Sequence, residues 1–239
     1  MMRRCAFLIT VFLAVVTPAA AQSTPEADPA NKICAPNTSA TPQATPVVKS
    51  EMKVEVAELE FDLIFLDAIV PHVESAIEMA VVAGDNSQHP EIDQFAQETI
   101  EAQQLQVETM RTWRADWYPD VPALTQQQLV EAMIVKLSDS PGVGGVAGLE
   151  EMNESHRRAD LAALCASGDH FDLTYIDTVI AHSSSAIVLA KEAQNRSMHR
   201  EIKEMAASIV TAQQYQIDQL LAWRESWFPN VPIGDHHGS

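Results

Sequence analysis

Apolar residues recur at spacings of three and four along two neighbouring stretches of the chain. The repeating positions are Phe65, Ile69, His72, Ala76, Met79 and Ala83 in the first stretch, and Ile92, Ala96, Thr99, Gln103, Val107 and Met110 in the second. This spacing is typical of an amphipathic helix with one buried face. The polar run 84–87 separates the stretches, and Pro90 suits the first position of a helix. We therefore predict an antiparallel hairpin of two helices.

The same pattern returns 110 residues later. Residues 61–122 align with residues 171–232 without a gap, and about two in five positions are identical. His72 aligns with His182, and "WRADWYPDVP" aligns with "WRESWFPNVP". One hairpin leaves an apolar face uncovered, whereas two hairpins can cover each other. The pattern predicts an all-α fold, a four-helix bundle made of two tandem, pseudo-symmetric hairpins.

The segments outside the hairpins differ in composition. Residues 1–21 combine a basic start, a short apolar core and small residues, which is typical of a secretory signal peptide. Residues 22–50 are rich in Pro, Thr, Ser and Ala and are expected to form a disordered tether. The hairpin repeats then occupy residues 51–122 and 169–232, a helical crossover connection occupies 123–168, and 233–239 is a flexible tail. No stretch after the signal peptide is expected to span a membrane.

The chain is strongly acidic. Its formal net charge of −18 becomes −20 when Arg3 and Arg4 leave with the signal peptide. Such a charge repels nucleic acid and anionic membranes. We expect a periplasmic or secreted protein with no nucleic-acid partner and no membrane association beyond export, while the sequence does not identify a protein partner.

Two cysteines, Cys34 and Cys165, remain after the signal peptide. In an oxidising compartment they can form a disulfide that pins the tether to the bundle. The alternative is two separate thiols, and the sequence leaves both open.

Polar residues interrupt the apolar stripes at matching heights. His72 lies 15 residues before Ser87, and Gln103 lies 16 residues after it, so both are about 23 Å from the loop. Since His182 and Gln213 repeat this arrangement, the four side chains are expected to form one polar layer at the bundle centre. Two interpretations are open. The imidazoles can hydrogen-bond glutamine amides or carboxylates such as Asp67 and fix the register of the helices, or they can bind a metal ion.

Another pair of histidines, His89 and His199, immediately precedes the second helix of each hairpin. They are candidates for helix N-caps or for loop ligands of a metal, and we favour the N-cap interpretation.

The stretch "FDLIFLDAIVPHVESAIEMA", followed by "HPEI", "AQQ" and a tryptophan, resembles the family of domain of unknown function 305. The resemblance covers both repeats and implies an exported, ferritin-like helical bundle, with some members linked to copper or silver through His and Met. The family motif reads Met-Ile-Pro-His-His, with a further Met seven residues after the first His. Of the His and Met positions that the family implies as ligands, this chain keeps His72, Met79 and Met110 in the first copy and only His182 in the second. The other family positions hold Ile69, Val73, Val179, Ser183, Leu189 and Leu220.

Pattern and resemblance together predict an exported, non-catalytic metal-binding protein for copper or a similar soft ion, acting in homeostasis or resistance. The expected ligands are His72, His182, Met79 and Met110. The alternative is a metal-free structural or protein-interaction bundle with hydrogen-bonded core histidines. We do not expect an enzyme, because neither hairpin has the Glu-x-x-His pair of a carboxylate di-iron site, and the chain lacks a nucleophile or phosphate-loop motif.

Overall fold

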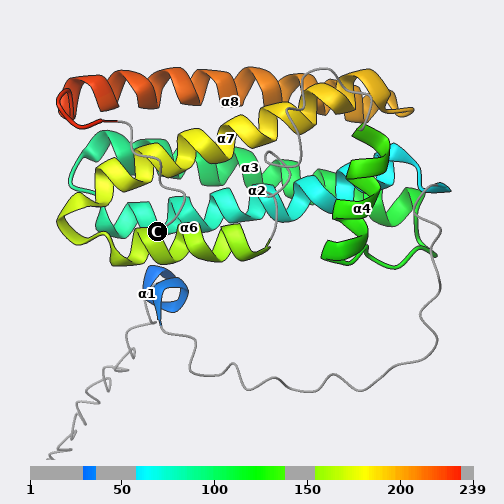
Figure 1. Cartoon of the computed structure of the whole chain (residues 1–239), viewed down its shortest axis with the longest axis horizontal. Coiled ribbons are helices and arrows are strands. Elements are labelled where there is room, and N and C mark those ends of the chain that lie inside the picture. Colours follow the sequence, from blue (N-terminus) through cyan, green and yellow to red (C-terminus); the bar gives the residue numbers. More distant parts are fainter. Residues whose placement is uncertain (1–28, 36–57, 138–153, 233–239) are drawn as a thin grey trace, which may run out of the picture.

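In a computed structural model of the chain, four long helices form two hairpins that lie side by side (Figure 1). The structure describes residues 29–35, 58–137 and 154–232. The first hairpin consists of α2 (Phe61–Asn86) and α3 (Pro90–Trp117), and the second consists of α7 (Phe171–Arg196) and α8 (Arg200–Trp227). The described residues contain helices and no strands, so the predicted all-α class is confirmed. Helix α2 packs on α7, which joins the hairpins along their first helices.

The end of each hairpin is closed by an arginine that is mostly shielded from solvent, Arg114 in the first and Arg224 in the second. Nε of Arg114 donates a hydrogen bond of 2.5 Å to Asp67 of α2, and its other nitrogens donate to the main-chain oxygens of Tyr118, Val121 and Pro122. These bonds satisfy carbonyls of the C-cap residue and of the turn after α3, and they hold that turn against α2. The equivalent contacts of the second hairpin join Arg224 to Asp177, Val231 and Pro232.

The apolar core is divided into two clusters by a layer of polar residues. Along α2 one cluster ends at Val73 and the other begins at Ala76, and along α7 the boundary falls between Val179 and Ala186. The buried polar residues at this height of the four helices, which we call the polar layer, are His72, Ser75, Thr99, Gln103, His182, Ser183, Ser185 and Gln213. The predicted layer therefore exists, and it contains both histidines and both glutamines of the sequence prediction.

The described part of the connection between the hairpins contains two shorter helices. Helix α4 (Gln126–Leu137) packs against α2, and α6 (Glu154–Ala166) packs against α2 and α7. Thr125 and Gln128 exchange hydrogen bonds in the manner of a capping box and start α4. A 3-10 turn, η2 (Gly168–His170), leads into α7, and Gly168 has the positive φ of 52° that favours glycine.

A short helix lies within the segment expected to be a tether. Helix α1 (Pro29–Cys34) packs against α2 and α6, and Cys34 forms a disulfide with Cys165 of α6. The disulfide settles the alternative that the sequence left open. The predicted signal peptide 1–21 and tail 233–239 lie outside the described residues.

The first helix of the second hairpin is apolar enough to be mistaken for a membrane span. The helical segment Gly168–Arg196 is long and apolar enough to cross a membrane, contrary to the expectation from sequence. However, 56% of its 18-residue apolar window is buried inside the bundle. Burial of this kind is that of a core helix, which must be hydrophobic over much of its surface.

Candidate functional site

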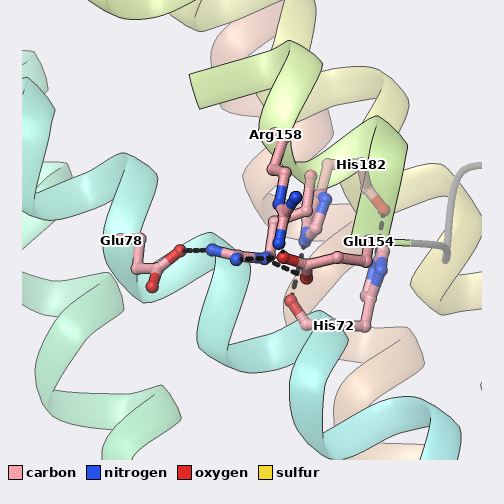
Figure 2. Close-up of polar contacts among 6 residues, drawn as sticks. His72, Glu78, Glu154, Arg158 and His182 are labelled. Atoms are coloured by element: carbon pink, nitrogen blue, oxygen red, sulfur yellow. Dashed lines mark hydrogen bonds and ion pairs between the residues drawn. The ribbon is translucent and has the colours of Figure 1, made fainter. Parts of the chain in front are cut away.

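His72 of α2 and His182 of α7 meet face to face in the polar layer. Their ring centroids are 3.7 Å apart and the ring planes differ by 5°. Nε2 of each ring donates a hydrogen bond of 3.1 Å to the main-chain oxygen of the other histidine. The residues are 4% and 7% exposed, so the pair is shielded from solvent. Figure 2 shows the two rings with these reciprocal bonds between α2 and α7.

The pair is held in its neutral form. Burial lowers the pKa of His72 from 6.5 to about 4, and the bond to the carbonyl of His182 opposes this only in part. Burial also lowers the pKa of His182, and the neighbouring His72 ring adds to that effect. Because a carbonyl oxygen only accepts, Nε2 of each ring carries the proton and Nδ1 carries the lone pair. Each histidine therefore presents one nitrogen in the form that binds metals.

The hydrogen-bond partners expected from the sequence are wrong. Asp67 is engaged by Arg114 at 2.5 Å, and it is 7% exposed as a side chain. Oε1 of Gln103 is buried and has no hydrogen-bond partner among the described residues, so it does not bind an imidazole. The histidines bond to each other's main chain because the two hairpins approach most closely along α2 and α7, where both rings lie.

The two methionines predicted as ligands lie away from each other. Met79 belongs to the core cluster that contains Phe95 and Tyr175, and Met110 belongs to the other cluster. Both are 0% exposed. The structure thus brings together His72 and His182, but it places Met79 and Met110 on opposite sides of the polar layer.

An ion cluster holds α6 against α2. Arg157 of α6 forms an ion pair with Glu78 of α2 and donates to Glu154 at 2.6 Å, and this bond lowers the pKa of the Glu154 carboxyl. Figure 2 shows Glu154 and Arg158 in the same view as the two histidines. Helix α6 is therefore fixed by ion pairs near its start and by the disulfide near its end.

Sequence reasoning missed a second set of histidine contacts at the hairpin loops. His89 and His199 occupy N-cap positions, but neither side chain caps its helix, so the predicted role is wrong. Nδ1 of His199 instead lies 2.6 Å from Asp62 of the other hairpin, and Nδ1 of His89 lies 2.5 Å from Asp172. All four residues recur at the offset of 110, and this shared duplication was the signal that could have linked them.

Within residues 29–35, 58–137 and 154–232, no three His, Cys, Asp or Glu side chains converge in a way that could hold a metal ion.

These features define an all-α protein in which two helical hairpins meet at a buried, stacked histidine pair. A family model described as Domain of unknown function (DUF305) matches residues 62–224. The chain belongs to this family, which confirms the resemblance seen in its sequence.

Solved structures of CopM have a similar fold. The Cu(I)-bound form is 24% identical with a TM-score of 0.53, and the match covers 70% of this chain and 97% of that chain. The apo form is 22% identical with a TM-score of 0.52, covering 70% and 98%. The Ag-bound form obtained by co-crystallization is 24% identical with a TM-score of 0.53, covering 70% and 97%. Comparison with the curated proteins finds no match.

Proposed function

We propose that this chain is an exported, non-catalytic protein that binds copper or a similar soft ion, in metal homeostasis or resistance. Its structural neighbours include CopM in Cu(I)-bound, Cu(II)-bound and Ag-bound forms, which suggests a copper-related role for the fold. The disulfide between Cys34 and Cys165 supports export, because such bonds persist in oxidising compartments.

The observation that carries the proposal is the neutral histidine pair in the polar layer. His72 and His182 each retain a lone pair on Nδ1, and their lowered pKa values keep it available in mildly acidic solution. Imidazole nitrogen is a good ligand for copper. The two imidazole nitrogens thus fit copper. Met79 and Met110 are not placed to add sulfur ligands in the arrangement described above.

The test is titration of the metal-free, disulfide-bonded chain with Cu(I) under anaerobic conditions. His72→Gln and His182→Gln retain an amide donor in place of Nε2 but remove the imidazole. Each variant should bind one ion fewer than the wild type. Binding by the wild type should persist at about pH 5, because the pKa of His72 is about 4. Equal stoichiometry and affinity in all three proteins would exclude the buried pair as a ligand.

A second candidate function is a metal-free structural or protein-interaction bundle. It is favoured by the reciprocal hydrogen bonds, since both Nε2 donors are already satisfied and fix the register of α2 against α7. In that case Cu(I) or Ag(I) leaves the melting temperature unchanged. A melting temperature that rises with metal concentration argues for the first candidate, because a ligand of the native state stabilises it by mass action.

A further inference from the structure

The loop that joins α7 to α8 is clamped by a carboxylate from the other hairpin. Asp62 of α2, which is 1% exposed, accepts hydrogen bonds from the main-chain nitrogens of Met198 and His199, each at 3.0 Å. It also accepts from Nδ1 of His199 at 2.6 Å. Trp117 of α3 stacks on the same imidazole, with centroids 3.8 Å apart and planes 5° apart. We call Asp62, Trp117 and His199 the Asp62 clamp.

The clamp orients the imidazole as in a metal site. Because a carboxylate only accepts, the proton of the neutral ring lies on Nδ1 and the lone pair lies on Nε2. A carboxylate that fixes a histidine in this way is the usual outer partner of a metal-bound imidazole. The side chain of His199 is 33% exposed, while Trp117 covers one face and Asp62 one edge. Nε2 of His199 has no hydrogen-bond partner among the described residues and is not one of their buried side-chain atoms without such a partner, so it retains contact with solvent.

A methionine, Met198, immediately precedes His199 in the chain. Met198 is 86% exposed, more than any other large apolar side chain in the described residues. At that exposure it contributes little to packing, although methionine normally fills gaps in a core. Its main chain is fixed by the bond to Asp62, and its three side-chain torsions let the sulfur move toward the neighbouring imidazole.

The other loop provides a natural control. Nδ1 of His89 lies 2.5 Å from Asp172, and the ring stacks on Trp227 with centroids 3.9 Å apart. The main-chain nitrogen that corresponds to Met198 belongs to Gln88, and it donates to Asp172 at 3.1 Å. The two loops thus share the oriented imidazole and differ in the sulfur.

We propose that Sδ of Met198 and Nε2 of His199 form a surface site for a monovalent soft ion of the Cu(I) and Ag(I) class. Thioether and imidazole ligands select such ions over hard cations. The acidic chain, with a net charge of −18, raises the local concentration of cations. The inference rests on the proposed function for the class of ion, but it concerns a different site, on the surface rather than in the core.

The experiment is a titration of the metal-free, disulfide-bonded full chain with Ag(I), a probe that avoids redox change. Met198→Gln places at this position the residue that the other loop has at Gln88, and it should lower the number of bound Ag(I) ions by one. Gln88→Met supplies the missing sulfur to His89 and should add one. Both positions lie in loops away from the core. All the variants share the remaining metal-binding groups on the surface, so a difference in the number of bound Ag(I) ions reports these two sites alone. Proton and nitrogen NMR should show Ag(I) shifting the Met198 methyl and the His199 Nε2 signals together.

The outcomes separate this inference from the proposed function. If Met198→Gln removes one ion and the His72→Gln/His182→Gln double variant binds as the wild type does, the surface site is correct and the buried site is wrong. If only the double variant loses an ion, the surface site is wrong and the buried one stands. Unchanged stoichiometry in both Met198→Gln and Gln88→Met, or an unshifted His199 signal, overturns the inference.

Discussion

Lowering the pH from about 7 to about 5 should destabilise the metal-free protein through its buried histidine pair. The pKa of His72 is about 4 in the folded chain and 6.5 when the ring is in water. Between these values the unfolded chain binds a proton that the folded chain excludes, so the free energy of unfolding falls as the pH falls through 6.5. The full effect of His72 is about 3 kcal/mol, of which about 2 kcal/mol is lost by about pH 5. The pKa of His182 is lowered as well, so it adds to the loss in the same direction.

The assay is urea unfolding of the full chain at both pH values, with chelator present and the disulfide intact, followed by circular dichroism. The range is chosen because free Asp and Glu side chains remain mostly ionised above about pH 5. The control is the His72→Gln/His182→Gln double variant, whose layer keeps amide donors and has no titrating ring. The wild type should lose at least about 2 kcal/mol more than the variant over this range. An equal loss in both proteins would refute the reasoning, because it would mean that the folded pair takes up protons as readily as the unfolded chain.

Three further effects on stability follow from the structure. Reduction of the Cys34–Cys165 disulfide, whose cysteines are 131 residues apart, should lower the free energy of unfolding by about 3–5 kcal/mol, and a chain with both cysteines changed to serine should not respond to reductant in the same melt. Asp67→Ala leaves the mostly buried Arg114 without its carboxylate and should lower the free energy of unfolding in urea by about 3–5 kcal/mol. Replacement of an exposed carboxylate should lower it by less than about 1 kcal/mol. Pro71→Ala should stabilise α2 by about 1–3 kcal/mol, since proline inside a helix lacks a hydrogen-bond donor. Ala181→Pro, at the equivalent position of α7, should lower the free energy of unfolding by about 3 kcal/mol. A change of the same sign in both variants would contradict the equivalence of the two helices.

The helices and the height of the polar layer could be predicted because they depend on spacing along the chain. A period of three and four identifies the buried face, and counting from Ser87 places His72 and Gln103 at one level. Spacing does not give the rotation of one helix about its neighbour. It therefore could not show that His72 faces the main chain of His182 while Gln103 leaves an acceptor without a bond.

The contact between Asp62 and His199 could not be predicted from local pattern for a related reason. The residues are 137 positions apart, and each is an ordinary polar residue at the end of a helix. Only packing of the hairpins decides that the start of α2 meets the loop before α8. The sequence repeat does relate the two residues, because their counterparts Asp172 and His89 recur at the same offset and form the same contact.

The geometry of these contacts explains where the two copies can differ. His72 contacts its own counterpart, His182, so a change in either ring alters the one contact that both copies share. Asp62, by contrast, does not contact its own counterpart, Asp172; it contacts His199, the counterpart of His89. The repeat therefore gives two separate clamps, Asp62 with His199 and Asp172 with His89, at opposite ends of the molecule. A substitution beside one clamp leaves the other intact, and Met198 opposite Gln88 is a difference of this kind. A property that belongs to one copy alone can therefore arise at the loops, whereas the centre of the bundle binds or packs through both copies together.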